Sequence, residues 1–457
     1  MPNEQAMTAF QEKLRGTLIQ PGDPAYEERR TIYNAMIDKR PRLIAQCTNV
    51  ADVIHAVRFG REQGLDTAIR SGGHNGPGLA LVDDGLVIDL SPMKGLRVDP
   101  QGKTVRVQPG CTWGDVDHAT HAFGLATVSG VISTTGVGGL TLGGGHGYLT
   151  RRCGLTIDNL LSADVVLADG RLARASEKEN PDLFWALRGG GGNFGVVTSF
   201  EYRLHPISTV VAGPMFWPLD EIETTLRWYR EWSPRAPEDA YAFYLVAAVP
   251  AGPPFPEEIH GRKVCGLLWC YTGPEDQADA VIQEARDVAE PLFEFTGPMP
   301  YPALQGMFDD LYPPGDQWYW KGDFVREISD EAIAQHVRHG EVPTAKSTMH
   351  LYPVDGAPQR VEPEDTAWRH RDANWSMVIA GVDPDPSNVP VIEEWARKYW
   401  KALSPHTVGG AYINFMMEEG EDRIRATYGD NYARLQKVKA KYDPDNFFHV
   451  NQNIEPA

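Results

Sequence analysis

Residues 130–147 read GVISTTGVGGLTLGGGHG, and eight of these eighteen residues are glycine. A second glycine-rich stretch, RSGGHNGPG at residues 70–78, lies about sixty residues earlier in the chain. Glycine lets backbone N–H groups approach an anion closely and adopts dihedral angles that other residues avoid. Either stretch alone is typical of a structural turn, whereas two such surfaces favour one large ligand bound by both.

A third glycine run, GGGNFG at residues 190–195, matches the pattern GxGxxG. In dinucleotide-binding folds that pattern follows a strand and opens a helix. Here residues 182–187 (DLFWAL) predict a helix before the run, and residues 196–204 (VVTSFEYRL) predict a strand after it. The order is reversed, so we reject an NAD site of the Rossmann kind.

Composition narrows the class of protein. A chain of 457 residues exceeds one ordinary hydrophobic core, so two domains are expected. The 43 basic and 62 acidic residues give a net charge of −19, which argues against nucleic acid and anionic membranes as partners. The five cysteines form no CxxC pair, which favours a reducing compartment. Because no apolar stretch is long enough for a signal or a membrane span, we expect a cytoplasmic protein.

Local patterns predict the elements of the first half. Apolar spacing predicts helices at residues 49–63 and 113–123, and short β-rich runs predict strands at residues 67–70, 85–90, 104–107 and 161–167. From residue 208 the chain has no glycine cluster and contains longer amphipathic helices, such as residues 220–232. We therefore place a second domain at residues 208–404, between a first part at residues 1–207 and a return at residues 405–457.

Five motifs occur in the order found in one known family. They are RSGGHN (70–75), GVGGLTLGGGHG (136–147), GLTIDN (154–159), DLFWALRGGGGNFG (182–195) and YDPDN (442–446). The chain resembles the berberine-bridge-enzyme-like branch of the vanillyl-alcohol-oxidase flavoprotein superfamily over residues 42–206 and 409–455. The middle of the chain is similar only in position and length.

This resemblance implies an α+β fold in which a PCMH-type FAD-binding domain carries an inserted substrate domain, an antiparallel sheet covered by helices. It also implies that FAD is joined covalently to His74 through the 8α-methyl of its ring. The loops Ser71–Gly73 and Gly136–Gly139 would hold the pyrophosphate, and Gly195 with Val196 would lie near the adenosine half.

One position departs from the family pattern. Many relatives carry a second covalent link from a cysteine in a Gly-x-Cys-Pro-Thr-x-Gly segment. The matching residues 130–136 are GVISTTG, with Ile132 in the place of the cysteine. Isoleucine cannot form a thioether, so a single attachment is expected.

The resemblance and the glycine surfaces together predict a set of cofactor-binding residues. These are His74, Arg70, Ser71, Gly72, Gly73, Asn75, Ile132, Ser133, Thr134, Thr135, Gly136, Gly138, Gly139, His146, Tyr148, Asp158, Asn159, Gly195, Val196, Asn414 and Asn451. No metal site is expected, because His118 and His121 have no third ligand in the pattern.

Two segments supply predicted catalytic residues. Residues 409–415 (GGAYINF) resemble a family strand whose tyrosine faces the flavin, so Tyr412 is the first candidate to take a proton from substrate. A tyrosine has an ordinary pKa of about 10, so this role requires a neighbour that lowers it. Residues 349–353 (MHLYP) alternate as a strand, with His350 and Tyr352 on one face as further candidates.

The predicted activity is that of an FAD-dependent oxidase acting on a small-molecule CH–OH or CH–NH group, with dioxygen as acceptor. Three alternatives stay open: a dehydrogenase that uses another acceptor, an amine oxidase of the hydroxynicotine-oxidase type, and a flavoprotein without catalysis. The basic cluster Arg369-His370-Arg371 either steers an anionic substrate or forms ordinary ion pairs.

Overall fold

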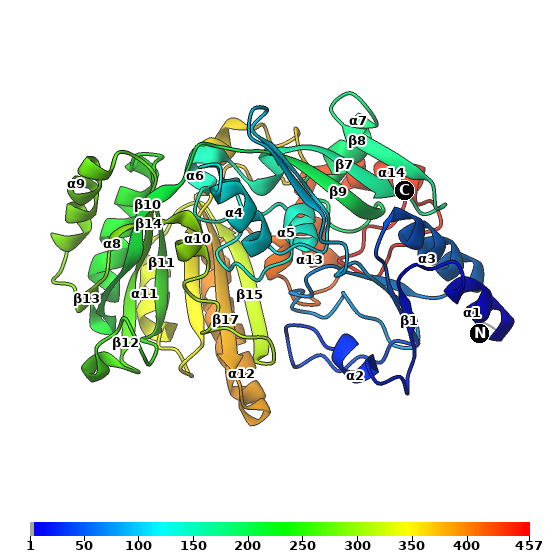
Figure 1. Cartoon of the computed structure of the whole chain (residues 1–457). Helices are drawn as coiled ribbons and strands as arrows, with labels where there is room; N and C mark the ends of the chain where they lie inside the picture. The colour runs from blue at the N-terminus through cyan, green and yellow to red at the C-terminus, as the bar shows by residue number, and fades with distance from the viewer. Residues whose placement is uncertain (1–3) are drawn as a thin grey trace.

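Three β-sheets organise residues 4–457, the part of the chain that this computed structural model describes (Figure 1). Two smaller sheets belong to the N-terminal segment, and a third, larger sheet belongs to the middle segment. The C-terminal segment returns to the side of the molecule that holds the N-terminus (Figure 1). This arrangement is the α+β fold with an inserted sheet that the sequence predicts.

The first sheet has four strands in the order β1-β2-β4-β3. Their bounds are β1 Thr17–Ile19, β2 Leu43–Gln46, β4 Leu86–Asp89 and β3 Thr67–Arg70. Strands β2, β4 and β3 are parallel, so helix α3 (Val50–Gln63) crosses between β2 and β3. Asn49 caps the first turn of α3, and Gly64 ends it in the left-handed region at φ 60°.

The second sheet is antiparallel, in the order β5-β6-β9-β7-β8. Its strands are β5 Leu96–Asp99, β6 Thr104–Val107, β9 Val196–Arg203, β7 Leu160–Val166 and β8 Leu172–Ser176. Gly170, at φ 75°, permits the tight turn between β7 and β8. The helices of this part are α1 Glu4–Gln11, α2 Tyr26–Arg29, α4 Trp113–His121, α5 Val137–Gly143, α6 Thr150–Cys153 and α7 Pro181–Leu187.

The third sheet is antiparallel and has eight strands, in the order β13-β10-β12-β11-β16-β17-β15, with β14 also paired to β10. Its strands are β10 Thr209–Pro218, β11 Ala240–Ala248, β12 Lys263–Tyr271, β13 Phe293–Glu294, β14 Gly297–Pro300, β15 Gln317–Val325, β16 Thr348–Pro353 and β17 Trp375–Asp383. All of them lie inside residues 208–404, the segment in which we predict the inserted domain.

The two faces of this third sheet have different neighbours. On β11, Ala242, Tyr244 and Val246 point to one face and pack in a core with the helices. The helices of this segment are α8 Ile222–Trp232, α9 Glu275–Arg286, α10 Tyr301–Gln305, α11 Asp330–His339 and α12 Val389–Leu403. Phe243 and Leu245 alternate with them and point to the opposite face, which lines a cavity. The sheet is therefore apolar on both faces.

The C-terminal segment is tied to the first part by a buried lysine, which donates to the carbonyl of Asn193. Helices α13 (Glu421–Tyr428) and α14 (Tyr432–Tyr442) pack on the second sheet's side of the molecule (Figure 1). Lys439 on α14 is fully buried and lies 2.6 Å from the carboxylate of Asp443. Its ammonium also donates to the carbonyls of Asn193 and Phe448. These bonds bring the YDPDN motif to the glycine run at residues 190–195.

One predicted element is wrong. Residues 409–415 form no strand: Ile413–Phe415 is a single 3₁₀ turn, and the residues before it are irregular. The helices and strands predicted for residues 49–204 are present within a few residues of the predicted bounds.

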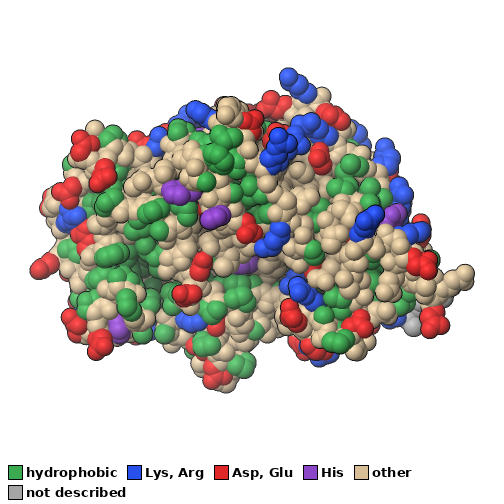
Figure 2. Space-filling view, viewed as in Figure 1, with side chains coloured by type: hydrophobic (Ala, Val, Ile, Leu, Met, Phe, Trp, Pro, Cys, Tyr) green, Lys and Arg blue, Asp and Glu red, His purple; other side chains and the backbone are tan. Residues whose placement is uncertain are grey.

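Acidic and basic side chains are both scattered over the face shown in Figure 2. Within residues 4–457, no helix is long and apolar enough to cross a bilayer.

Candidate active site

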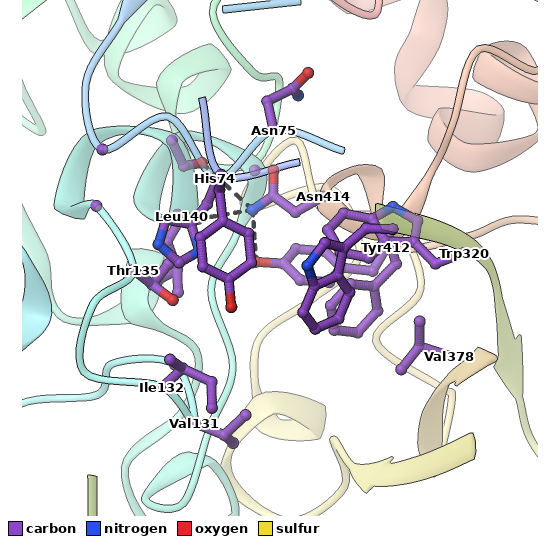
Figure 3. A pocket seen from close by; sticks show the side chains of 18 of the residues that line it. His74, Asn75, Val131, Ile132, Thr135, Leu140, Trp320, Val378, Tyr412 and Asn414 are labelled. Atoms are coloured by element: carbon purple, nitrogen blue, oxygen red, sulfur yellow. Dashed lines mark hydrogen bonds between the residues drawn. The ribbon is translucent and has the colours of Figure 1, made fainter. Parts of the chain in front are cut away.

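A cavity of about 400 Å³ lies between the glycine loops of the first part and the inner face of the third sheet (Figure 3). The wall on the first side includes residues 71–75, 130–132, 135–143 in part, and 191–195 in part. Strands β10, β11, β12, β15, β16 and β17 supply alternate side chains to the opposite wall. Residues from the first and last parts of the chain thus face residues of the middle segment.

The two long glycine motifs touch each other at this wall. A Cβ on Gly72 would lie 2.5 Å from Cα of Gly136, closer than any real side chain tolerates. A Cβ on Gly139 or Gly192, by contrast, would meet nothing within 4 Å, and both residues line the cavity. Glycine is needed at the first pair for close backbone approach, and at the second pair it leaves room for a ligand.

His74 lies at this wall with its ring stacked on Tyr33, with ring centroids 4.0 Å apart and an interplanar angle of 19°. Burial lowers the pKa of His74 to about 4, against a smaller opposing effect of a hydrogen bond to the Thr134 backbone. The imidazole is therefore neutral at neutral pH and keeps a lone pair for bond formation. Tyr33 in turn donates to the carbonyl of Tyr312, at 2.6 Å.

Tyr412 reaches the cavity from an irregular segment rather than from a strand. Its oxygen accepts hydrogen bonds from the Asn414 amide at 2.7 Å and from the Gly145 N–H at 3.1 Å. The 3₁₀ turn at Ile413–Phe415 brings Asn414 back against Tyr412, so the two still act together. Burial raises the pKa of Tyr412 and outweighs both donors. The pKa of Tyr412 is therefore raised and not lowered, as the role of a base would require, and the hydroxyl stays protonated at neutral pH.

His350 and Tyr352 share one face of β16, as predicted, and they are hydrogen-bonded through Nδ1 of His350. Nε2 of His350 lies 2.8 Å from Oγ1 of Thr348, which donates to the carbonyl of Val246 at 3.0 Å. Burial lowers the pKa of His350 to about 3, so the ring is neutral. It raises the pKa of Tyr352.

The direction of this chain of hydrogen bonds follows from its last member. A carbonyl oxygen only accepts, so the Thr348 hydroxyl must donate to Val246. The Thr348 oxygen then accepts from Nε2–H of His350, which leaves Nδ1 as the acceptor for the Tyr352 hydroxyl. Tyr352 therefore gives its own hydrogen to His350, and its oxygen lone pairs are left to accept from a ligand.

His146 lies among these aromatic rings. Its centroid is 4.7 Å from that of Tyr412 and 5.2 Å from that of Tyr352. Nε2 is 3.1 Å from the Ser376 hydroxyl, whereas Nδ1 is buried without a hydrogen-bond partner among residues 4–457. Burial lowers the pKa of His146 to about 3. A buried polar atom without a partner points to a ligand or a water molecule at that position.

Most of the predicted residues line the cavity. Those that do are His74, Ser71, Gly72, Gly73, Asn75, Ile132, Thr135, Gly136, Gly138, Gly139, His146, Tyr148, Gly195, Asn414, Asn451, Tyr412, Tyr352 and His350. Oδ1 of Asn451 is a further buried acceptor without a partner in the described part of the chain. The structure thus brings together residues that are up to 380 positions apart in the sequence, from Ser71 to Asn451.

Six predicted residues do not line it: Arg70, Ser133, Thr134, Asp158, Asn159 and Val196. The Ser133 hydroxyl donates to Asp309, and Val196 lies in an apolar core. Asp158 holds a two-pronged ion pair with Arg371, with both N···O distances 2.8 Å. In the structure these contacts position neighbouring segments.

The basic cluster at residues 369–371 is also absent from the cavity wall. Arg371 is paired with Asp158, Arg369 with Asp430 at 3.2 Å, and the His370 ring stacks on Phe324. Of the two interpretations, ordinary ion pairing describes the cluster.

Several wall residues were not identified from the sequence. Tyr33 precedes the first motif and gives no local signal of its contact with His74. Trp318, Trp320 and Phe243 come from β15 and β11, two stretches in which the sequence does not indicate which aromatic side chains face the cavity. Knowing that one face of the third sheet is turned to the glycine loops would have identified them.

Comparisons with known proteins agree with this geometry. The model of the FAD binding domain family matches residues 41–176, and the model described as berberine and berberine like matches residues 411–455. These two matches cover the glycine motifs at residues 70–78 and 130–147 and also Tyr412.

Two curated relatives match this chain over nearly their whole length. An FAD-linked oxidoreductase of Dictyostelium discoideum is 31% identical, over 99% of this chain and 97% of that protein. An (R)-6-hydroxynicotine oxidase of Paenarthrobacter nicotinovorans is also 31% identical, over 97% of each chain.

Solved structures share the fold. A 6-hydroxy-D-nicotine oxidase of Arthrobacter nicotinovorans superimposes with a TM-score of 0.87 at 28% identity, covering 97% of this chain and 98% of that one. A chitooligosaccharide oxidase gives a TM-score of 0.82 at 24% identity, covering 99% and 100%, which shows the fold alone. The chain therefore belongs to the berberine-bridge-enzyme-like family of FAD-linked oxidoreductases and is an enzyme of that kind.

Proposed function

We propose that this enzyme is an oxidase that holds FAD in the cavity through a single covalent bond to His74, oxidises a substrate CH–OH or CH–NH group, and uses dioxygen as acceptor. The observation that carries the proposal is the shared cavity: the glycine loops with His74 form one wall, and the Tyr352 hydrogen-bond chain forms the other. Bound FAD would take a hydride from the substrate carbon and pass two electrons to dioxygen, with release of hydrogen peroxide.

The residues at the first wall suit the cofactor. Any Cβ at Gly139 or Gly192 would enter the space that these two glycines leave open, and Oδ1 of Asn451 is an acceptor that no group among residues 4–457 uses. The neutral imidazole of His74 supports a bond from one ring nitrogen to the 8α carbon. No cysteine occurs among the cavity-lining residues of the described chain, and Ile132 lines the cavity where relatives carry the second link. Both facts support one attachment.

The residues at the second wall suit proton removal. We assign Tyr352 to accept the hydrogen of the substrate hydroxyl or amine while its own hydrogen moves to Nδ1 of His350. The imidazole is a weak base at a pKa of about 3. A weak base is sufficient here. When the substrate carbon loses a hydride, its O–H group becomes the O–H of a protonated carbonyl, which is a far stronger acid than an alcohol. The substrate thus loses one hydride and one proton and becomes a carbonyl compound.

Tyr412 has a different part in this proposal. Its oxygen already accepts two hydrogen bonds, so it offers its hydrogen rather than a lone pair. We assign it to donate a hydrogen bond within the cavity, not to take the substrate proton. This revises the role predicted from the sequence.

The attachment is tested without any substrate. Acid denaturation of the wild-type protein is expected to leave the yellow colour on the polypeptide, and the same treatment of His74→Ala is expected to release all of it. Colour that persists in His74→Ala would reveal a second anchor and contradict the single link.

The acceptor is tested by stopped flow. The flavin is reduced with dithionite without oxygen and then mixed with aerated buffer. Typical enzymes turn over about 10 times per second, so reoxidation is expected at that rate or faster. Reoxidation slower than about one per second would favour a dehydrogenase with another acceptor.

A further inference from the structure

Charged side chains are absent from the part of the cavity wall that residues 4–457 form. Of the described residues that line it, none is Asp, Glu, Lys or Arg. The three histidines of the wall are neutral, because burial lowers the pKa of His74 to about 4 and those of His146 and His350 to about 3. Backbone N–H groups of the glycine loops can hold the pyrophosphate of FAD, but a charged substrate group against the third sheet would find neither a counter-ion nor such a loop. Burying an unpaired charge there is unfavourable enough that the group loses or gains a proton instead.

The wall opposite the glycine loops is built largely of rings and aliphatic side chains. They are Phe216, Phe243, Phe255, Phe308, Trp318 and Trp320, with Leu245, Leu268, Val378 and Ala380 between them. A ligand with many hydroxyl groups would leave most of them without partners on such a surface, which is costly for each group. Flat apolar ligands match it, because aromatic faces and edges pack against one another.

Two donors interrupt this apolar surface. The indole N–H groups of Trp318 and Trp320 are buried and have no acceptor among residues 4–457. Trp318 is only 8% exposed. The Trp320 ring lies against the His74 loop: a Cβ on Gly76 would be 2.4 Å from it. A buried donor without a partner indicates an acceptor that the described chain does not supply, and Figure 3 shows Trp320 beside Tyr412.

Taken with the proposed function, on which this inference rests, we propose that the substrate is an uncharged alcohol with an aromatic or similarly flat apolar body and a hydrogen-bond acceptor for an indole N–H. An amine would enter only as its minor neutral form, because the described residues of the cavity wall offer no carboxylate to an ammonium group. The proposal therefore favours oxidation of a CH–OH group over oxidation of a CH–NH group, two alternatives that the sequence leaves open.

The test measures binding rather than turnover. The FAD-loaded protein is titrated without oxygen with 4-methoxybenzyl alcohol, 4-methoxybenzylamine, 4-(hydroxymethyl)benzoate and D-xylose, and the dissociation constant is read from quenching of tryptophan fluorescence. At pH 7 the alcohol is expected to bind at least tenfold more tightly than the other three. The amine is expected to bind about tenfold more tightly for each unit by which the pH rises toward its own pKa.

Three outcomes would overturn the proposal. They are amine binding at pH 7 that equals alcohol binding and does not change with pH, tighter binding of the sugar or the benzoate than of the alcohol, and failure of the alcohol to bind at millimolar concentration.

A charge placed on the wall provides the converse test. Val378 lies on the inner face of β17, so Val378→Asp is expected to tighten amine binding at least tenfold at pH 7 and to weaken alcohol binding. Val378→Ala, which removes bulk without adding charge, is the matched control and is expected to keep the wild-type order. An unchanged order in a folded, yellow Val378→Asp protein would show that ligands do not meet this wall, against the proposal.

These results are separable from those on function. A protein that binds the alcohol but is reoxidised slowly by air contradicts the oxidase and leaves the substrate class standing. A protein that is reoxidised rapidly but prefers the ammonium compound contradicts the substrate class alone.

Discussion

Two buried tyrosines face the same cavity with opposite hydrogen-bond directions. The oxygen of Tyr412 accepts from Asn414 and Gly145, whereas the hydroxyl of Tyr352 donates to His350. Burial raises the pKa of both, so neither is ionised at neutral pH. The hydrogen-bond partners of each tyrosine therefore determine its role. Of the two, only Tyr352 donates its hydrogen to a group that can accept a proton, the imidazole of His350.

The hydrogen-bond chain on β16 predicts a graded loss of turnover. Tyr352→Phe removes the group that receives the substrate hydrogen, and a positioned acid or base contributes about 10²–10⁴-fold to rate, so kcat is expected to fall by about that factor. Thr348→Val removes the acceptor that fixes the His350 tautomer and is expected to lower kcat by roughly tenfold with little change in KM. Steady-state kinetics with a reactive alcohol measures both.

A conservative variant separates positioning from simple packing. Thr348→Ser keeps the hydroxyl and is expected to restore kcat. The pH profile supplies a second readout: because the pKa of His350 is about 3, the wild-type rate is expected to show no inflection near pH 6.5 from this residue. An equal loss in Thr348→Ser and Thr348→Val, or such an inflection abolished in His350→Gln, would contradict the assigned chain.

At the scale of elements, the loop that carries His74 is held against the start of α5 by a contact between two glycine backbones. A Cβ on Gly136 would lie 2.5 Å from the backbone nitrogen of Gly72. Gly136 has an ordinary backbone conformation at φ −71°, so crowding and not dihedral strain makes glycine necessary here. The position of His74 therefore depends on Gly136, a residue of another element that has no side chain to hold the two backbones apart.

This contact predicts different effects for two alanine variants of the same motif. Gly136→Ala forces the loop and the helix apart, and overpacking of this kind costs about 1–3 kcal/mol, so the free energy of unfolding is expected to fall by that amount. Gly139→Ala adds a Cβ that meets no atom of residues 4–457 within 4 Å, and alanine favours the helix, so stability is expected to stay equal or to rise slightly. Thermal unfolding of the two purified variants compares them.

The amount of FAD that Gly139→Ala binds, compared with wild type, is a second measurement on this variant. Gly139→Ala is expected to bind less FAD in spite of its intact fold, because its new methyl group enters the cavity. Equal flavin content in Gly139→Ala and wild type would place the cofactor away from this helix.

At the scale of the whole molecule, a buried carboxyl lies where the first part meets the inserted segment. Asp117 on α4 accepts a hydrogen bond from the side chain of Gln305 on α10, at 3.1 Å, and its other oxygen has no partner within residues 4–457. Burial raises the pKa of Asp117 to about 7, against a smaller lowering effect of that hydrogen bond. The junction is therefore most stable when this carboxyl is protonated.

The raised pKa predicts how stability changes with pH. Between about pH 4 and pH 7 the folded chain keeps a proton on Asp117 that the unfolded chain has lost, so this group's contribution is present below pH 4 and is lost as the pH rises to 7. The loss is at most about 1.4 kcal/mol per pH unit. Asp117→Asn is expected to remove this part of the slope. Chemical unfolding of both proteins at several pH values between 4 and 8 measures the difference, and parallel curves would show that Asp117 ionises normally.

The sequence by itself determined the parts of the fold that depend on neighbours along the chain. The cap at Asn49 with the stop at Gly64, the alternation of short strands, and the glycine runs around His74 are local signals, and the elements follow them. The motif order identified the family, and the family model matches confirm it. At residues 409–415 the resemblance to a family strand is misleading, because the backbone N–H of Phe415 donates to the carbonyl of Tyr412, at 2.7 Å, and closes a 3₁₀ turn.

Only the tertiary structure decided what the cavity is made of. The stacking of Tyr33 on His74, the direction of the hydrogen-bond chain that ends on Val246, and the absence of charge from the described wall all depend on residues far apart in the chain. A strand's two faces look alike in sequence when both are apolar, as they are in the third sheet, so the alternation could not tell which face would meet the helices and which would meet the glycine loops. That choice is made when the sheet packs, and with it the chemistry of the site.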